Sequence, residues 1–301
     1  MVVRLPRDYV VYSFSRRHQA RYTAAPGDVA VFETLDALGG QVVDETTTLE
    51  SIDWSRVNPA TGPLYVEGAK PGDTLVVEIE DIKVFDRAVI VVAPGFGALP
   101  DKKIRPTVKI LKVAGRKVVF NDLEIEARPM VGVVGVAPED GDLPTGTSGY
   151  HGGNMDVALL TVGSRVYLPV FVEGALLALG DVHVVQSDGE ICVAAAEASG
   201  EVRVKLSLIK GKRPKYPVVE VGDRYSIVAF GKDLDEAAYR ASEEAVSVLM
   251  NALGTSFEEA YMLASLVVDL RINQVVDPMK GVRAEVPKTY VKLEHFLHYT
   301  T

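Results

Sequence analysis

Short segments of alternating apolar and polar residues recur along most of the first 230 residues, and this pattern limits the fold more than any other feature. Residues 73–81 read DTLVVEIED, which shows the two-residue period of a strand with one buried face. Turn sequences rich in Gly, Pro and Asp separate the segments. The other predicted strands span residues 29–32, 89–92, 116–120, 130–136, 165–172, 201–208 and 225–230. Many strands without interleaved helices predict antiparallel sheets in a sandwich or barrel-like body.

The pattern changes near residue 231. Residues 233–250 are rich in helix formers, and Gly254 suits the left-handed cap that ends a helix. A capping box that begins at Ser256 starts a second helix. The chain is therefore predicted to be α+β and predominantly β. We expect a β-rich body over residues 1–230 that carries the functional loops, and a smaller C-terminal α/β segment over 231–301 packed on it.

Composition and charge exclude several classes of protein. Cys192 is the only cysteine, so a disulfide scaffold is excluded. The formal net charge of −9 argues against nucleic-acid binding. No apolar run reaches the roughly 18 residues that a membrane span requires, and the opening residues MVVRLPR lack the features of an export signal. We therefore expect a cytoplasmic protein without nucleic-acid or membrane partners.

Familiar catalytic motifs are missing from the sequence. Residues 146–150 (GTSGY) lack the final glycine of a serine nucleophile elbow, and residues 95–97 (GFG) are too short for a dinucleotide-binding loop. There is no Walker loop and no His-Glu-x-x-His zinc motif. Cys192 lies in an apolar, strand-like segment and is interpreted as a buried structural thiol. We expect neither a covalent nucleophile nor an organic cofactor.

A polar, glycine-rich stretch between about residues 132 and 197 is the candidate site. The Asp-Gly pair at 188–189 lies between apolar runs, which predicts a two-residue hairpin turn. That register places His183 opposite Ala194. Asp181 and His183 are two residues apart, so on a strand both side chains project from one face. A carboxylate and an imidazole that face a small residue can bind a divalent metal ion or relay a proton.

Asp156, on a separate glycine-rich loop, is the expected third ligand, which makes Asp156, Asp181 and His183 the predicted metal site. Carboxylate and imidazole ligands suit zinc, which lowers the pKa of a bound water. Calcium or another divalent ion remains an alternative. The same residues also have a structural interpretation, because an aspartate after glycine is common in turns and a strand histidine is often a hydrogen-bonded core residue.

Two glutamates are further candidates, for proton delivery to a leaving group. In the predicted hairpin Glu190 shares a face with His183 but lies four ladder positions away, roughly 13 Å at about 3.3 Å per residue. Glu190 is therefore expected outside direct contact with His183. Glu33, at the end of a predicted strand, is the second candidate.

Several longer motifs occur in a fixed order over about 250 residues. They are PGDV at 26–29, NPATGPLYVEGA at 58–69, GVVGVAP at 132–138, GGNMD at 152–156, YLPV at 167–170, EGALL at 173–177, GDVH at 180–183 and QSDGE at 186–190. At these residues the sequence resembles the acetamidase/formamidase family. The resemblance implies hydrolysis of formamide, acetamide or similar short amides to a carboxylate and ammonia. It also implies a β-rich fold with a C-terminal α/β portion and a homo-oligomer, a dimer or larger.

The expected mechanism is attack of an activated water on the amide rather than attack by a protein nucleophile. The metal ion, or His183 acting as a base, deprotonates the water, with Asp181 and Asp156 as ligands or acid–base groups. Backbone N–H groups of the glycine loop stabilise the oxyanion. The residues expected to contact the substrate lie on this loop and are His151, Gly152, Gly153 and Asn154. A hydrolase of another small C–N substrate and a non-catalytic β-rich protein that binds a small ligand are the alternatives.

Overall fold

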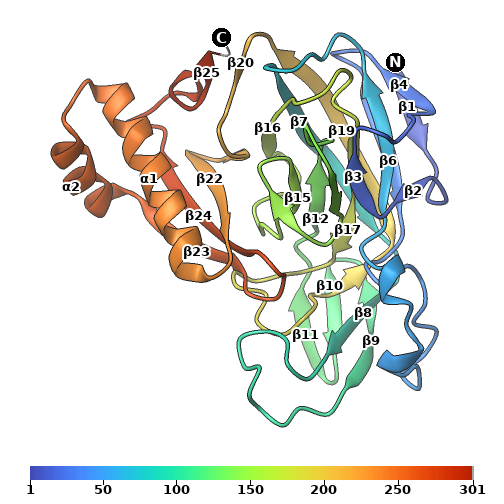
Figure 1. The fold of residues 1–301 in the computed structure, drawn as a ribbon. Coiled ribbons are helices and arrows are strands. Elements are labelled where there is room, and N and C mark those ends of the chain that lie inside the picture. Colours follow the sequence, from blue (N-terminus) through green and yellow to red (C-terminus); the bar gives the residue numbers. More distant parts are fainter. Residues whose placement is uncertain (300–301) are drawn as a thin grey trace.

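The computed structural model describes residues 1–299 and consists mainly of antiparallel strands (Figure 1). One sheet has nine strands, and every neighbouring pair in it is antiparallel except β1 and β5. Its order is β1 (Val2–Leu5), β5 (Val29–Thr34), β19 (Gly200–Ile209), β7 (Thr74–Val84), β16 (Arg165–Pro169), β21 (Val218–Val221), β22 (Arg224–Gly231), β24 (Lys280–Pro287) and β23 (Asp269–Gln274). The predominantly β prediction is confirmed.

The second sheet has 12 strands. Its main path is β11 (Leu123–Glu126), β10 (Lys117–Phe120), β9 (Thr107–Ala114), β8 (Arg87–Val92), β18 (Glu197–Ala198), β17 (Leu177–His183), β12 (Met130–Gly135), β15 (Gly152–Asn154) and β14 (Ser148–Gly149). β6 (Ala60–Val66) pairs with β17 and also with β2 (Val10–Val11) and β4 (Tyr22–Ala24). Two small ribbons join β3 (Ser13–Ser15) to β13 (Asp142–Pro144) and β20 (Lys212–Arg213) to β25 (His298–Tyr299). The 3₁₀ turns are η1 (Leu49–Ser51), η2 (Trp54–Arg56) and η3 (Leu293–Phe296).

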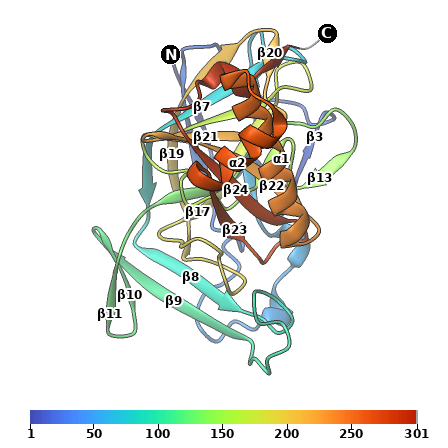
Figure 2. The same cartoon turned by 90° about the vertical axis from the view of Figure 1, so that its left-hand side faces the viewer.

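Apolar side chains pack in two main layers. The inner faces of the two large sheets enclose the larger cluster, in which Phe32 and Leu168 of the first sheet meet Leu64 and Leu177 of the second. A second cluster lies between the other face of β22 and β24 and the helix α1 (Leu234–Leu253). Figure 2 shows α1 and α2 (Phe257–Val267) covering this side of the nine-stranded sheet. The body is therefore a sandwich with one helical outer layer.

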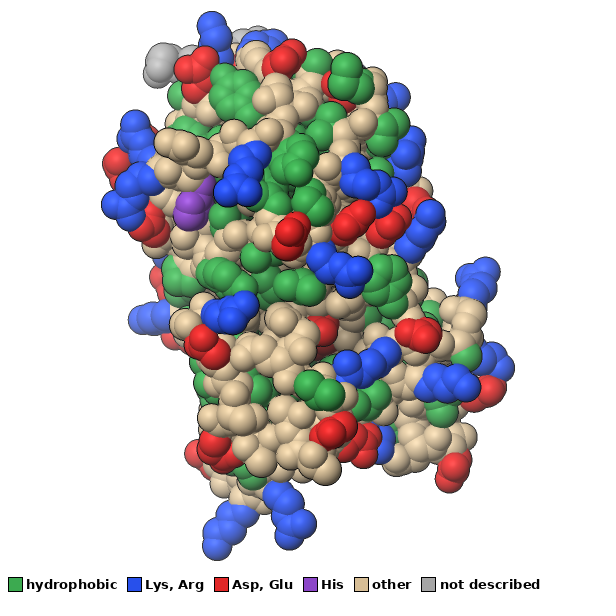
Figure 3. Space-filling model, turned by 90° about the vertical axis from the view of Figure 1, so that its right-hand side faces the viewer, with side chains coloured by type: hydrophobic (Ala, Val, Ile, Leu, Met, Phe, Trp, Pro, Cys, Tyr) green, Lys and Arg blue, Asp and Glu red, His purple; other side chains and the backbone are tan. Residues whose placement is uncertain are grey.

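The helix ends follow the sequence signals. Gly254 ends α1 with a left-handed φ of 64°, which glycine adopts without a Cβ penalty. At the start of α2, Ser256 Oγ accepts from the Glu259 N–H while the Glu259 carboxylate accepts from the Ser256 N–H, as the capping box predicts. None of the helices within residues 1–299 is long and apolar enough to cross a bilayer. On the side opposite the helices, Figure 3 shows acidic and basic side chains interspersed over the surface.

The hairpin predicted at 188–189 is wrong. β17 pairs with β18 so that His183 lies opposite Glu197, and residues 184–196 form a loop between them. The Gly189 N–H donates to the Asn273 carbonyl and the Gly189 carbonyl accepts from the Val275 N–H. Asp188 and Gly189 do form a turn, closed by the Glu190 N–H, which donates to the Ser187 carbonyl at 3.2 Å. Because the bonds with Asn273 and Val275 attach this turn to the end of β23, the flanking residues do not pair as the predicted hairpin. Cys192, predicted to be buried on a strand, is half-buried in this loop.

Candidate active site

Asp181 and His183 lie at the end of β17 with both side chains buried. β12 flanks this end of the strand on one side and β18 on the other, which fixes its position. Asp181 has a φ of 55°, a left-handed conformation that is uncommon for a residue with a Cβ. Oδ1 of Asp181 lies 3.2 Å from Nε2 of His183. The structure thus brings the two side chains together as the spacing predicts.

Asp156 follows β15 and is also buried. Its Oδ1 lies 4.0 Å from Nε2 of His183. The carboxylates of Asp156 and Asp181 converge above Gly132 of β12, because a Cβ at Gly132 would lie 2.4 Å from Asp156 Oδ1 and 2.5 Å from Asp181 Oδ2. Glycine at this position therefore makes room for the two carboxylates.

Two glutamates reach the same place from the loop and from β18. Glu197, opposite His183, places Oε2 3.0 Å from Nε2 of the imidazole. Glu190 in the loop has a carboxylate oxygen within 4.8 Å of ligand atoms of both Asp156 and His183. The prediction that Glu190 lies far from His183 is wrong, because the loop folds back over the site instead of continuing as a hairpin.

Four buried carboxylate oxygens around His183 have no hydrogen-bond partner within residues 1–299. They are Asp156 Oδ1, Asp181 Oδ1, Glu190 Oε2 and Glu197 Oε2. The oxygens of Asp181 and Glu197 are close to Nε2 but lack the angles of a hydrogen bond. Buried polar atoms without partners are rare in folded proteins. The cluster is therefore incomplete as a hydrogen-bond network.

Gln186 fixes the tautomer of His183. The Gln186 amide nitrogen donates to the carbonyl of Asp156 at 2.8 Å and to that of Asn273 at 3.3 Å. Because carbonyl oxygens only accept, the Gln186 Oε1 must face the imidazole, where it lies 2.8 Å from Nδ1. Nδ1 therefore carries a proton and Nε2 faces the carboxylates. This is the arrangement that orients a metal-binding histidine.

The surroundings of His183 favour positive charge. Burial alone lowers the pKa of the imidazole, but the carboxylates of Glu197 and Asp181 outweigh burial and raise this pKa well above its usual range. Burial opposes ionisation of Asp181 too, yet the charge of His183 lowers its pKa below the usual value. The carboxylates therefore favour positive charge at the imidazole.

The remaining carboxylates titrate in the opposite direction. Burial, followed by the charge of Asp181, raises the pKa of Asp156 well above its usual range. Burial and the nearby Asp156 do the same to the pKa of Glu190. Burial raises the pKa of Glu197 to about 7. Such crowding of acids in a desolvated site is typical of functional centres.

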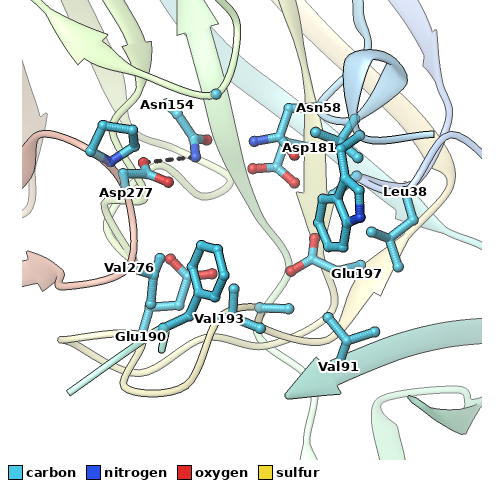
Figure 4. Close-up of a pocket in the computed structure, with 17 residues that line it drawn as sticks. Leu38, Asn58, Val91, Asn154, Asp181, Glu190, Val193, Glu197, Val276 and Asp277 are labelled. Atoms are coloured by element: carbon cyan, nitrogen blue, oxygen red, sulfur yellow. Dashed lines mark hydrogen bonds between the residues drawn. The ribbon is translucent and has the colours of Figure 1, made fainter. Parts of the chain in front are cut away.

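A cavity of about 190 Å³ opens beside this cluster (Figure 4). Asp181, Glu190 and Glu197 line it, together with polar residues Asn58, Asn154 and Asp277. The remaining wall is mostly apolar and consists of Ala37, Leu38, Trp54, Val57, Val91, Phe96, Gly146, Val193, Ala194, Val276 and Pro278. The volume is below the roughly 300–1,000 Å³ of sites for drug-sized ligands. The cavity suits a small molecule with one polar end.

Asp277 comes from the C-terminal segment, in the turn between β23 and β24. Its Oδ2 accepts a hydrogen bond of 2.9 Å from Nδ2 of Asn154. Burial and the charges of Asp156 and Asp181 raise the pKa of Asp277 well above its usual range. The cavity is therefore closed by two parts of the chain more than 100 residues apart.

The structure places four of the predicted residues elsewhere. Glu33 lies on β5 in an ion pair of 2.8 Å with Arg4, away from the cavity lining. His151 is buried edge-on against Phe14, with ring centroids 4.9 Å apart. Gly152 and Gly153 are buried within β15, and Cβ atoms there would lie 2.3 Å from Val134 O and 2.2 Å from Thr147 O. These two glycines allow close strand packing, whereas Asn154 does line the cavity.

Three residues of the site were not predicted from the sequence. Glu197 had a signal, because a glutamate follows three alanines and precedes a fourth in an apolar stretch, and a buried acid in such a stretch is seldom structural. Gln186 lies three residues after His183, without a pattern that marks it. Asp277 precedes proline and therefore resembles an ordinary turn residue.

The side chains fit a divalent metal ion. In a tetrahedral site with bonds of about 2.0–2.2 Å, ligand atoms lie roughly 3.3–3.6 Å from one another. The distances from Nε2 of His183 to the nearest oxygens of Glu197, Asp181 and Asp156 are 3.0, 3.2 and 4.0 Å. These distances lie on either side of the tetrahedral value. Within residues 1–299 two triads bring their ligand atoms within 4.8 Å of one another, Asp156 with His183 and Glu190, and Asp181 with His183 and Glu197, and both share His183. Each triad offers the oxygen and nitrogen ligands that suit a divalent ion.

Comparison with known proteins connects this site to a family. Residues 14–147 and 141–290 match the model of the Acetamidase/Formamidase family. The crystal structure of an acetamidase from Bacillus halodurans superposes with a TM-score of 0.93 at 40% identity, covering 96% of this chain and 98% of that one. A predicted acetamidase/formamidase from Thermoanaerobacter tengcongensis gives a TM-score of 0.93 at 38% identity, covering 98% of both chains.

A curated formamidase from Methylophilus methylotrophus is 29% identical over 255 residues, which cover 64% of this chain and 62% of the formamidase. The chain thus spans about three fifths of the length of this relative. The family model nevertheless matches nearly the whole chain, and the Bacillus structure covers 96% of it. The chain therefore belongs to the acetamidase/formamidase family.

Proposed function

We propose that this protein hydrolyses short aliphatic amides, formamide and acetamide among them, to a carboxylate and ammonia. The observation that carries the proposal is the convergence of unpaired carboxylate oxygens on Nε2 of His183 beside a small cavity. The described residues that line the cavity include no serine, threonine or cysteine. A water molecule is therefore the nucleophile that the site favours. The names of the acetamidase and formamidase relatives agree with this chemistry.

We propose Asp156, Asp181 and His183 as ligands of a divalent metal ion, with zinc the first candidate. Glu197 is close enough to His183 to join them. His183 offers Nε2 because its Nδ1 is bound to Gln186. When bound, the ion supplies positive charge that acidifies a water and polarises the amide carbonyl.

Glu190 is proposed as the residue that transfers protons. It lines the cavity with one carboxylate oxygen unpaired, whereas Glu197 Oε1 is held by the N–H of Ala195 at 2.7 Å. Glu190 accepts a proton from the attacking water and donates one to the amide nitrogen. The C–N bond breaks, the nitrogen leaves as ammonia, and the hydroxyl remains on the acyl carbon as a carboxylic acid. One water is consumed for each amide.

Release of ammonia from formamide and acetamide tests the proposal, with elemental analysis of the purified protein to identify the ion. We expect His183→Ala to lose turnover and bound metal while keeping its fold. His18→Ala is the matched control, because the His18 ring is bonded to Ser13 outside the cavity. A folded His183→Ala protein with full amidase turnover would contradict the mechanism.

We also propose a cytoplasmic homo-oligomer whose C-terminal segment, residues 231–301, packs on the body formed by residues 1–230. Helix α2 exposes an apolar group made of Phe257, Tyr261, Met262 and Leu266. Contiguous exposed apolar surface of this kind is typical of subunit contacts. Light scattering of the wild type and of Leu266→Lys measures the oligomeric state. We expect the substitution to reduce the molar mass of the particle in solution.

A further inference from the structure

One end of the cavity presents two hydrogen-bond acceptors from different parts of the chain, Asn154 and Asp277. The Asn154 side chain is 3% exposed, and its Nδ2 donates to Asp277 Oδ2 at 2.9 Å. Because Nδ2 of the Asn154 amide points toward Asp277, its Oδ1 points away from Asp277. Figure 4 shows this oxygen on the side that faces Asn58 and Asp181 across the cavity.

The Asn154 Oδ1 is buried and has no hydrogen-bond partner within residues 1–299. A buried acceptor without a donor is unfavourable, so the site is completed by a ligand that brings an N–H or O–H group. Asp277 lies beside it and adds a carboxyl oxygen as a second acceptor. The pair therefore favours a ligand atom that carries two donors and little negative charge.

The nitrogen of a primary amide is such an atom, because it carries two N–H groups and no free acceptor. An ester has no hydrogen-bond donor at this position. An N,N-dialkyl amide also has no donor, and its two alkyl groups are too large to fit beside the acceptors. The ammonia released by hydrolysis, once protonated, is bound by the same acceptors. A water molecule could also donate to these acceptors. Only an amide bound there also brings its carbonyl carbon beside the proposed metal ligands.

We propose that Asn154 Oδ1 and the Asp277 carboxylate form the subsite for the amide nitrogen and select primary amides over esters and N-substituted amides. This inference rests on the proposed amide hydrolysis and assigns specificity to residues outside the ligand set. It also explains why a turn of the C-terminal segment reaches the cavity. Sites that hydrogen-bond an N–H of the substrate discriminate strongly against analogues that lack it.

The test compares kcat/KM for acetamide with kcat/KM for methyl acetate in the wild type, Asp277→Asn and Asn154→Leu. Both substitutions are expected to lower the amide-to-ester ratio 10- to 100-fold, chiefly through the amide. Asp269→Asn is the matched control, because this side chain is half-exposed on β23 and paired with Arg224. The amide-to-ester ratio of Asp269→Asn should stay within twofold of the wild-type ratio.

A reciprocal double variant, Asn154→Asp with Asp277→Asn, guards against misfolded single variants. It retains one amide and one carboxylate, so its amide-to-ester ratio should exceed that of either single variant. In the wild type alone, kcat/KM should fall at least 10-fold from acetamide to N-methylacetamide and again to N,N-dimethylacetamide. Equal turnover of the three amides, or an unchanged ratio in both folded single variants, overturns the subsite. A wild type that hydrolyses no amide overturns the proposed function instead.

Discussion

The guanidinium of Arg283 binds the carboxylate of Asp188 through two parallel hydrogen bonds of 2.9 and 2.8 Å. Arg283 lies on β24 and is 2% exposed, whereas Asp188 belongs to the loop that carries Glu190. Arg283 also donates to Asn273 and Glu285. β24 thus holds the loop that carries Glu190 beside the cluster around His183.

We expect Arg283→Met to lower the free energy of unfolding by about 3 kcal/mol, because the substitution leaves the buried Glu285 and Asn273 side chains without their donor. Amidase turnover should fall as well, since Glu190 loses its support. Arg203→Met is the control, as its ion pair with Glu80 is largely exposed and should contribute less than about 1 kcal/mol. Urea denaturation and ammonia release measure the two effects. Equal stability of the two variants would contradict this role.

Gln186→Met should weaken metal binding about 10- to 100-fold by removing the acceptor that orients His183. Gln186→Glu should weaken it less, because a carboxylate oxygen still accepts from Nδ1. Titration with a competing chelator measures the affinity. Gln41→Met, in a surface contact with Asp53, is the control and should bind metal as the wild type does. Equal metal affinity of the methionine and glutamate variants would show that Gln186 does not orient His183.

Gly132→Ala should abolish metal binding, because its Cβ would occupy the space of the Asp156 and Asp181 oxygens. Val131→Ala on the same strand is a useful contrast, since Val131 is buried in the core. We expect that variant to be less stable, by about 2 kcal/mol, and yet to retain metal and turnover. Elemental analysis measures the bound metal of each variant, and thermal unfolding measures its stability. Retention of a full complement of metal by Gly132→Ala would refute the steric argument.

His151 makes the fold sensitive to acid. Burial lowers its pKa to about 4 from the usual 6.5, and neither ring nitrogen has a hydrogen-bond partner within residues 1–299. The unfolded chain therefore binds a proton between pH 6.5 and 4 that the folded protein does not, so stability falls as pH decreases through this window. The shift corresponds to about 3 kcal/mol.

We expect His151→Met to remove that acid-dependent loss, whereas His18→Gln should retain it. Denaturant unfolding at several pH values between 7 and 4 gives the slope for each protein, within the window set by the pKa of His151. Parallel slopes for the wild type and His151→Met would show that other groups dominate.

The sequence correctly predicted features that depend only on residues close together in the chain. The caps at Gly254 and Ser256 lie where the sequence places them, because the bonds that form a cap span a single helical turn. The pairing of Asp181 with His183 was predictable for the same reason, as side-chain alternation along a strand needs no information from elsewhere. Asp156 followed from its position on a separate glycine-rich loop.

Long-range contacts decided the rest. Asp188 and Gly189 form a turn, but Gly189 also donates to the Asn273 carbonyl and accepts from the Val275 N–H, and these long-range bonds prevent the predicted hairpin register. The changed register exchanged Ala194 for Glu197 opposite His183 and brought Glu190 to the site. Asp277 could not be predicted, since nothing near it in sequence reports that the turn meets Asn154. Glu33 was misplaced because its strand neighbours give no hint of the ion pair with Arg4.

The contribution of Asp277 has a consequence for biosynthesis. It follows Glu197 by 80 residues, which a ribosome adds in roughly 4–16 s at about 5–20 residues per second. A nascent chain thus contains His183 and the four acids around it well before it contains the part of the cavity wall that Asp277 supplies. Asn273 and Arg283, which hold Gln186 and the loop around Asp188, are made equally late, so the carboxylate cluster and the cavity wall reach their final positions together, once the C-terminal segment has been synthesised.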